Sequence, residues 1–474
     1  MAISGCSQSV EDQAALGGGA ARRGLTPGQL IVVAALFAAF ATSALLNPTA
    51  TFSYLILLVQ IGFLVLAAWR IVLIVVGRTG PPDALPTQDL PRYTIMAALH
   101  DEAEVVSQLI ERLSQIDYPA DRLEGFLLLE AHDLETIDAA EACARPDWLR
   151  ILVAPPGTPC TKPRALNYGL TRATGELLTI YDAEDDPDPR QLREAASRFA
   201  ESGAQNIACL QSPLRIRRQP NSPYASPFLD RQFAVEYAAL FDVTLPGMAR
   251  LGLPFPLGGT SNHFRVDVLR SVGGWDAWNV TEDADLGFQL WRAGWKLGVL
   301  RRPTYETPPG SLEHWLPQRV RWLKGYMQTW GVHTRDVRPL GWRGGLSLVM
   351  TLGAGLVSAG AHALSLGWVA AWVLVSLIAG VPAAPPMFAM SVLILAIAAA
   401  WLQCLIGARR GHVPYSATDM ISAPAYWSLL TLAFVHAVWR LIREPFIWDK
   451  TAHHRDEDVI ATPSIAASAG RQAA

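Results

Sequence analysis

Acidic side chains gather in the segment YDAEDDPDP, directly after an apolar run. The segment contains Asp182, Glu184 and Asp185 and is restricted by two prolines. Carboxylates at the end of a strand suit a hard divalent cation, which takes oxygen ligands and often shares them with substrate phosphates. A solvent-exposed acidic turn is the alternative, because Asp and Pro are both common in turns. The apolar run ahead of the segment favours the metal site.

A second acidic group lies in NVTEDADLGF, at the start of a predicted helix. Thr281 is a candidate N-cap, and Glu282 and Asp283 follow it. Acidic residues in a first turn ordinarily cap a helix or compensate its dipole, and this segment alone favours that role. A carboxylate held in a cleft can instead take the proton from an attacking hydroxyl that lies within hydrogen-bond reach.

Two further segments carry groups suited to phosphates or sugar hydroxyls. TKPRALNYGL places Lys162 and Arg164 ahead of a predicted helix, and LGGTSNHFR places Thr260 and Ser261 after two glycines. Cations and accessible backbone amides bind anions. Each segment alone is weak evidence, because Gly-Gly-Thr also marks an ordinary turn. We expect His263 to be a structural hydrogen-bonding residue, since no second histidine stands at metal-ligand spacing.

Cationic and aromatic residues alternate in QRVRWLKGYMQTW, residues 318–330. A basic amphipathic helix lying on lipid headgroups explains the cations and the indoles. A helix on lipid headgroups does not explain the presence of Gln318 and Gln328. Arginine can bind a diphosphate through two hydrogen bonds and tryptophan offers a flat face to a sugar ring, so a sugar-diphosphate site is the alternative.

The elements that must position these groups alternate between strand and helix. RYTIMAAL, EGFLLLE, RILVAPP and ELLTIYD read as short buried strands, and helical spacing follows the first of them at Val105, Leu109 and Leu113. This alternation predicts a mainly parallel sheet with helices on both faces. Such sheets bind ligands at the carboxyl ends of their strands, where the acidic segments lie.

Apolar residues are concentrated at the two ends of the 474-residue chain, of which 51% is hydrophobic and 17% charged. Residues 29–78 contain two runs long enough to cross a hydrocarbon core of about 30 Å, and four more candidate spans follow residue 341. Cations flank the first pair and predict cytoplasmic ends. Six spans would put Arg409 and Arg410 outside, against the same rule, so one segment is expected to lie in the interface or re-enter.

The charge balance and the cysteines exclude other classes of protein. The net charge is -3 and the pI is about 6.4, so no basic excess indicates nucleic-acid binding. The five cysteines are scattered and form no CxxC pair, which indicates neither a zinc site nor a disulfide framework. Reduced thiols in a cytosolic domain are expected.

In this order, the motifs resemble those of the membrane-embedded family 2 glycosyltransferases of the cellulose, hyaluronan and chitin synthase type. The shared pattern is a series of spaced acidic residues followed by QxxRW, and it continues here through Gly325 and Gln328. TKPRALNYGL, LGGTSNHFRVDVLRSVGGWD and FIWDKTAHH are closest to bacterial exopolysaccharide synthases, including mixed-linkage β-glucan synthases. The likeness covers about residues 90–455.

The resemblance implies a GT-A-type α/β domain, Rossmann-like and mainly parallel, inserted between transmembrane helices. It implies a disordered cytosolic tail (1–28), two transmembrane helices (29–78), a cytosolic catalytic domain ending in an interfacial QxxRW segment (79–340), about four transmembrane or interfacial helices (341–442), and a gating-like loop with the C-terminal tail (443–474). The chain after that loop is too short for a PilZ-like domain.

The resemblance also implies a role for each candidate residue. Asp283 would be the general base, supported by Glu282 and Arg321; Asp182 and Glu184 would bind Mg2+ or Mn2+; Glu130, Asp133, Lys162 and Asp182 would bind the donor; Gln318, Trp322, Gln328, Thr260 and Ser261 would contact the acceptor or product; and Trp448, Lys450 and Thr451 would form the gating-like loop. The acidic pair of the family is spaced apart here as EAHD, and DxD is replaced by DAED.

The expected activity is processive, inverting polymerisation of a sugar, with UDP-glucose as the first candidate donor, into a β-linked exopolysaccharide. The product would leave through the membrane helices of an inner-membrane protein, with periplasmic or outer-membrane export proteins as possible partners. A single transfer to a membrane lipid is the alternative. A degenerate, non-enzymatic scaffold is the third hypothesis.

Overall fold

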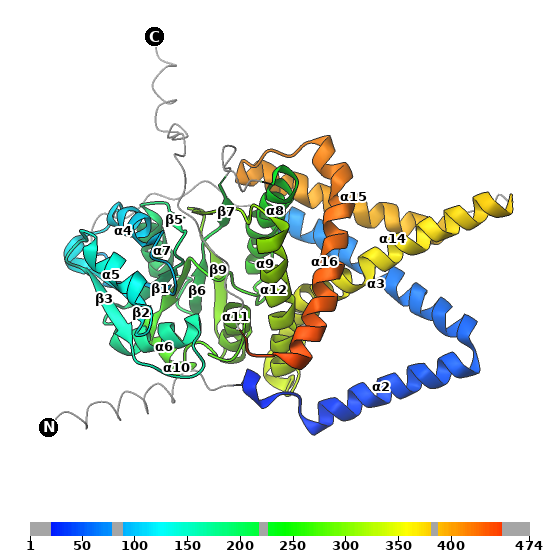
Figure 1. Cartoon of the computed structure of the whole chain (residues 1–474), viewed down its shortest axis with the longest axis horizontal. Coiled ribbons are helices and arrows are strands. Elements are labelled where there is room, and N and C mark those ends of the chain that lie inside the picture. The colour runs from blue at the N-terminus through cyan, green and yellow to red at the C-terminus, as the bar shows by residue number, and fades with distance from the viewer. Residues whose placement is uncertain (1–19, 78–88, 218–225, 381–386, 448–474) are drawn as a thin grey trace, which may run out of the picture.

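The computed structural model describes residues 20–77, 89–217, 226–380 and 387–447. An α/β domain lies on one side, and long apolar helices project from the other (Figure 1). Helices α12 (Leu312–His333) and α16 (Ala417–Arg443) lie between them. The QxxRW segment therefore stands on a helix at the junction of the two parts.

The domain is built on a seven-stranded sheet in the order β3-β2-β1-β4-β8-β6-β9. The four strands β3, β2, β1 and β4 are parallel, β8 is antiparallel to both its neighbours, and β9 is parallel to β6. This confirms the mainly parallel sheet. The strands are β1 (Tyr93–Leu99), β2 (Leu123–Glu130), β3 (Leu149–Ala154), β4 (Leu177–Tyr181), β6 (Ile207–Gln211), β8 (Asn262–Arg265) and β9 (Lys296–Val299). A small second sheet joins β5 (Asp186–Pro187), β10 (Thr304–Glu306) and β7 (Leu214–Ile216).

Alternate residues of the central strand face two separate layers of helices. Ile95, Ala97 and Leu99 of β1 pack with α4 (Val106–Ser114), α5 (Leu134–Ala142) and α7 (Gln191–Ala200). Met96 belongs to the opposite core, with α6 (Lys162–Arg172), α10 (Val266–Ser271) and α11 (Glu282–Arg292). Burial on both faces explains why these strands read as continuous apolar runs.

Within the described ranges, five helices are long and apolar enough to cross a membrane. They are α2 (Pro27–Leu46), α3 (Pro48–Val76), the continuous stretch Arg338–Ala379 that contains α13 (Gly341–Leu348) and α14 (Ala354–Ala379), α15 (Met387–Gly411) and α16. Two of the four candidate runs after residue 341 lie in one continuous helical stretch, which passes through Gly367. A single glycine costs a helix only about 1 kcal/mol.

Both ends of α16 contact the α/β domain. At its start, Gln232 of α8 (Pro227–Ala239) donates to the carbonyl of Asp419 at 2.7 Å. Just beyond its end, Lys324 of α12 donates to the carbonyl of Glu444 at 3.2 Å. These contacts hold α16 against α8 and α12, next to the α/β domain.

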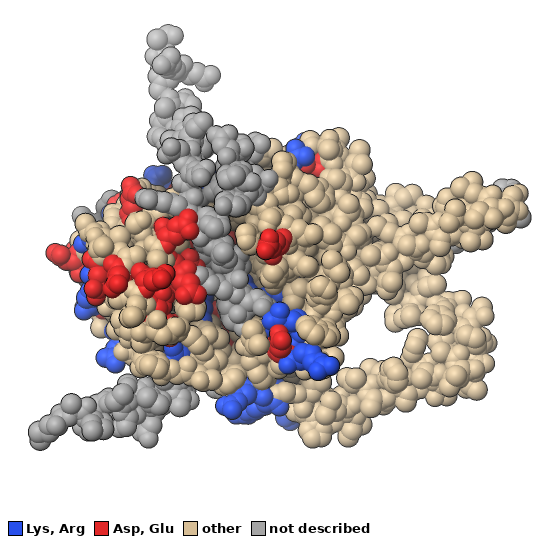
Figure 2. Space-filling model, viewed as in Figure 1, with Lys and Arg blue, Asp and Glu red and all other residues tan. Residues whose placement is uncertain are grey.

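The C-terminal end of α15 is also fixed to the domain. Arg410 donates to the carbonyls of Gly77 at 2.5 Å and Asp242 at 3.0 Å. Gly407 approaches α8 so closely that a Cβ there would lie 2.7 Å from the Ala238 carbonyl. In Figure 2 the projecting helices show no charge on the visible face, and Lys and Arg gather where the domain meets them. If α16 lies in the interface, the other four candidate spans keep Arg409 and Arg410 on the domain side, in agreement with the charge rule.

The expected disordered tail is ordered in its last part. Residues Ala21–Arg23 form a 3-10 turn, and the Ala21 amide donates to Asp276 Oδ2 at 2.7 Å. Thr26 then caps α2 through a reciprocal capping box with Gln29. Residues 1–19 lie outside the described residues.

This arrangement predicts the side of the membrane from which each turn can be labelled. In a cysteine-free background, His412→Cys and Glu444→Cys should react with a membrane-impermeant thiol reagent in inside-out vesicles but not in right-side-out ones. Asn47→Cys, in the turn between α2 and α3, should show the opposite pattern and serves as the control. Labelling of positions 412 and 444 from opposite sides would mean that α16 crosses the membrane.

Candidate active site

The carboxylates of the acidic turn after β4 have two roles, one structural and one in the candidate site. Asp185 is fully buried, and its Oδ2 accepts hydrogen bonds from the Asp182 amide at 2.7 Å and from the Thr260 hydroxyl. Asp185 therefore fixes the turn. Asp182 and Glu184 of the same turn are the pair that the resemblance implied for a cation.

Lys162 opens α6 and reaches across to the same turn. Its ammonium is ion-paired with Asp182 and donates to the Gly259 carbonyl at 2.7 Å. Burial opposes the charge on Lys162, but Asp182 and then Glu282 outweigh it and raise the pKa of the amine. The lysine consequently brings a permanent cation to the carboxylates.

Asp283 lies beside Asp182, although about 100 residues separate them in the sequence. A Cβ built on Gly259 would lie 3.4 Å from Asp283 Oδ2 and 4.0 Å from Asp182 Oδ2, so both carboxylates border this glycine. Burial raises the pKa of Asp283. Burial and then the charge of Asp283 raise the pKa of Glu282 to about 8. Near neutral pH Glu282 therefore holds a proton.

Thr281 was expected to cap α11, and it does not. No side-chain hydrogen bond caps this helix, and the Thr281 amide and hydroxyl instead donate to Asn279 Oδ1 at 3.0 and 3.4 Å. The first turn of α11 is held from outside, by α12. This leaves the acidic residues of the helix start facing the site instead of closing the helix end.

Glu306 is a site residue that the sequence reasoning missed. It ends β10 in the small sheet, and burial, followed by the charges of Asp185, Glu184 and Asp182, raises its pKa well above the usual range. Like charges packed this closely need a counter-ion. A set of carboxylate oxygens fits Mg2+ or Mn2+. The sequence offered no signal, because Glu306 follows an ordinary loop and reaches the site only through the second sheet.

Helix α12 brings Arg321 to the other side of Asp283. Its guanidinium donates to the Val280 carbonyl at 3.3 Å, and its charge lowers the pKa of Asp283, against the larger effect of burial. The helix can lie this close because residue 325 is glycine. A Cβ on Gly325 would overlap the Thr281 side chain.

The first arginine of QRVRW, Arg319, has a structural role. It forms two hydrogen bonds to Glu236, at 2.8 and 2.7 Å, and lies 4.5 Å from the Trp322 ring centre. Lys324 is also fully buried. A helix that buries these two cations in protein is not a basic surface on lipid headgroups. Trp322 packs beside Phe233 with ring centres 6.3 Å apart.

Three residues expected at the acceptor bond within the protein instead. Gln328 accepts from the Val280 amide at 3.1 Å and donates to the Pro445 carbonyl at 2.9 Å. Ser261 is fully buried and bonds to Thr304 Oγ1 at 2.6 Å, and the Thr260 hydroxyl bonds to Asp185. These side chains support the site. Gln318 lies on α12 one turn before Trp322, and Trp448, Lys450 and Thr451 lie outside the described residues.

His263 has the structural role expected for it. Its Nδ1 lies 2.6 Å from the Tyr93 hydroxyl and its Nε2 lies 3.1 Å from Gln191 Oε1. Burial lowers the pKa of His263 to about 3, so the ring is neutral. It takes no part in the site.

A second polar group, Glu130 with Asp133, stands at the end of β2. Because β1 separates β2 from β4, this group lies about 10 Å from Asp182. Glu130 is buried and ion-paired with Arg164. Asp133 accepts from the Asp101 amide at 2.6 Å; burial opposes its charge, but this bond and those from Thr136 lower its pKa. The polar group after β2 and the acidic turn after β4 form the two ends of the site, and they suit the two ends of a nucleotide.

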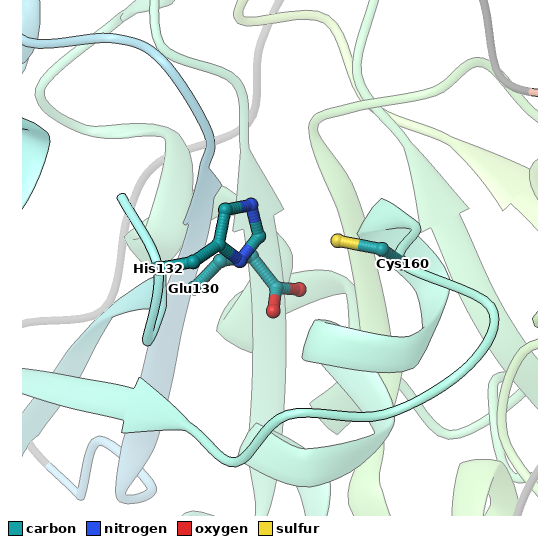
Figure 3. A group of neighbouring side chains, drawn as sticks. All are labelled: Glu130, His132 and Cys160. Atoms are coloured by element: carbon teal, nitrogen blue, oxygen red, sulfur yellow. The ribbon is translucent and has the colours of Figure 1, made fainter. Parts of the chain in front are cut away.

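Glu130 also faces His132 and Cys160 (Figure 3), with ligand atoms within 4.8 Å of one another. Burial and the charge of Glu130 raise the pKa of the Cys160 thiol. A protonated thiol is a poor metal ligand, and Arg164 already neutralises Glu130. This group therefore belongs to the polar end of the site, and the ion pair with Arg164 disfavours a metal ion there.

The close contact at Gly325 predicts an asymmetric effect of two alanine substitutions on α12. Gly325→Ala should lower the melting temperature measured by thermal unfolding, because the new methyl group must push Thr281 and the start of α11 away. Gly331→Ala is the matched control, since its Cβ would meet Leu25 at an ordinary 3.4 Å. Equal melting temperatures for the two variants would contradict the close packing.

Comparison with known proteins agrees with this geometry. Residues 177–403 match the family described as "Glycosyl transferase family group 2". A β-monoglucosyldiacylglycerol synthase of Synechocystis sp. is 27% identical over 280 residues, which cover 57% of this chain and 55% of that protein. Cellulose synthase 1 catalytic subunit (UDP-forming) of Komagataeibacter xylinus is 27% identical over 260 residues, 53% of this chain and 32% of that protein.

A solved structure shares the fold. The mannosyltransferase PcManGT of Pyrobaculum calidifontis, in complex with GDP-Man and Mn2+, superposes with a TM-score of 0.52 and covers 81% of this chain and 99% of its own, at 16% identity. The chain spans about a third to a half of the length of the two curated relatives. The chain therefore contains a family 2 glycosyltransferase domain with a GT-A-like fold, flanked by several apolar helices.

Proposed function

We propose that this chain transfers a sugar from a UDP-sugar, with inversion, to an acceptor hydroxyl held at Asp283. The observation that carries the proposal is that Asp182 and Asp283 border the same glycine, with Lys162 and Arg321 beside them. Nucleophile activation and leaving-group stabilisation are the two requirements of such a transfer, and this site holds groups for both.

In this mechanism Asp283 accepts the proton of the attacking hydroxyl, and its raised pKa matches that task. A single displacement inverts the anomeric carbon, so an α-linked donor gives a β-linked product. Lys162 and Arg321 neutralise charge that grows on the departing diphosphate. A Mg2+ or Mn2+ ion held by Asp182 and Glu184 would supply further charge neutralisation at the diphosphate oxygens.

The donor proposal is UDP-glucose, with Glu130 and Asp133 toward the uridine. It is supported by two relatives, a β-monoglucosyldiacylglycerol synthase and a UDP-forming cellulose synthase subunit. The chain would sit in the inner membrane as a multi-pass protein with its catalytic domain in the cytoplasm. The four out-and-back helices and the position of Arg410 support this placement.

As acceptor we propose first a growing β-linked exopolysaccharide that leaves through the membrane helices. Trp322, on the QRVRW helix, offers an indole face close to Arg321. A cavity of about 620 Å3 lies between α3, α8, α14, α15 and α16, and Ser358, His362 and Gln403 line it. Periplasmic or outer-membrane export proteins would be the partners in this case.

A membrane lipid is the second candidate acceptor, and the same cavity favours it. Its walls are mainly aliphatic, and its lining includes Tyr326, whose pKa is raised by burial and then by Asp283. The cavity therefore reaches the neighbourhood of the catalytic carboxylate. Arg70 also lines it, and no hydrogen bond or ion pair joins Arg70 to another described residue. A cation in this setting suits the phosphate of a lipid headgroup.

The test is to incubate the purified full chain in lipid vesicles with Mg2+ or Mn2+ and radiolabelled UDP-glucose. Long product that β-glucanase shortens would establish the polysaccharide acceptor. Label only in extractable lipid, reduced by Arg70→Gln but not by Arg70→Lys, would establish the lipid acceptor. Transfer to neither, with UDP-glucose and with other UDP-sugars, would overturn the proposal.

The two carboxylates at the start of α11 should respond differently to amide substitution. Asp283→Asn should lower the transfer rate by about 10²-fold or more, because it removes the base. Glu282→Gln should keep most of the rate at pH 7, where Glu282 is protonated, and should depart from the wild type only above pH 8, where Glu282 loses its proton. Rates measured from pH 6 to pH 9 decide this. A loss at pH 7 in Glu282→Gln equal to that in Asp283→Asn would show that the base is misassigned.

A further inference from the structure

The segment ahead of the first membrane helix contacts the loop that carries the catalytic carboxylates. The Ala21 amide donates to Asp276 Oδ2 at 2.7 Å, and the Arg22 guanidinium lies 4.5 Å from the ring centre of Trp278. Arg335, just past α12, donates to the Ala20 carbonyl at 2.7 Å. Residues 20–23 are therefore fixed between α12 and the loop 275–281.

The same loop is held from its other side by α12. Asn279 Nδ2 donates to Thr329 Oγ1 at 3.0 Å, and the Val280 amide donates to Gln328 Oε1 at 3.1 Å. The loop ends at Glu282, where α11 begins. Its position consequently decides where the first turn of α11 presents Asp283.

Trp278 is the point at which three distant segments meet. Its ring lies under Arg22 and makes an edge-to-face contact with Phe446 at 5.3 Å and 84°. Asp276 is buried and links the parts, since its Oδ1 also accepts from the Trp278 amide at 3.0 Å. An exposed cation over an indole is by itself a weak contact. The buried Asp276 carboxylate accepts from the Ala21 and Trp278 amides, and this makes the contact between Arg22 and Trp278 part of a fixed arrangement.

Membrane helix α2 follows this contact almost at once. It begins at Pro27, and Gln29 Nε2 donates to the Gly331 carbonyl at 2.8 Å. The catalytic loop is thereby tied, through four residues of main chain, to the point at which the chain enters the apolar helices. A loop tied in this way holds a fixed distance from the bilayer surface.

We propose that Arg22 and Trp278 are positioning residues, through which the segment before α2 holds the loop 275–281 so that Asp283 faces the acceptor. Neither side chain is part of the donor site, which is built from Lys162, Asp182 and Glu130 on other elements. This inference rests on the proposed transfer. Its signature is a change in turnover without a change in donor binding.

The test compares Arg22→Gln with Arg23→Gln in the full chain in vesicles. Arg23 is the matched control, because it is the neighbouring exposed cation of the same turn. Arg22→Gln should lower kcat about threefold to fivefold, the range of one cation–π contact, with KM for the UDP-sugar and Kd for UDP unchanged. Arg22→Lys should restore the rate, and Trp278→Ala should lower it further than Arg22→Gln.

Hydrogen exchange separates this inference from the proposed function. In Arg22→Gln, amides of residues 275–281 should exchange faster than in the wild type, while Arg23→Gln leaves them unchanged. No change in exchange, or equal kinetics for the two variants, would overturn the positioning role. If the wild type transfers no sugar, but Arg22→Gln still exchanges faster than the wild type, the proposed function is overturned. The contact between residues 20–23 and the loop 275–281 is then still supported.

Discussion

Repulsion among buried carboxylates is the constraint around which this domain is arranged. Asp182 and Glu184 of one turn, Glu306 and Asp283 come from three different parts of the chain, and burial makes the charges of Glu306 and Asp283 costly. Lys162 and Arg321 approach from opposite sides, and Asp185 is diverted into hydrogen bonds with the turn itself. A site with this excess of negative charge is prepared for a ligand that brings cations, such as a metal–diphosphate complex.

The junction with the apolar helices obeys a second constraint, close approach of backbones. Gly325 lets α12 reach the loop before Asp283, and Gly407 lets α15 lie directly against α8. Small residues allow helices to pack closely where no hydrophobic effect drives them together. The polar side chains of α12 form hydrogen bonds to two neighbouring elements. Arg319 bonds to α8, and Gln328 bonds to the catalytic loop.

Much of this arrangement is predictable from local sequence, and the failures have physical reasons. Apolar strands followed by acidic residues indicated that Asp182 and Glu130 lie at the carboxyl ends of their strands. This was correct, and the two residues lie at the same edge of the sheet because the carboxyl ends of parallel strands share an edge. Glu306 escaped because the strand that delivers it is three residues long and belongs to the second sheet. The sequence motifs alone suggest that Ser261 and Gln328 bind a ligand. Only the three-dimensional contacts show that these side chains form hydrogen bonds within the protein. Hydropathy alone also did not show that two candidate runs after residue 341 belong to one continuous helical stretch.

One hydrophobic core is shared between the α/β domain and the helices around it. Leu73 of α3 and Tyr426 of α16 belong to the same buried cluster as Met96 of β1 and Phe233 of α8. During synthesis strand β1 leaves the ribosome more than 300 residues before Tyr426 does. The domain thus stays incomplete, with an apolar face uncovered, until the last helix has emerged. A cell making this protein must shield that face throughout translation, and a catalytic domain cut free of its helices would keep it exposed and tend to aggregate.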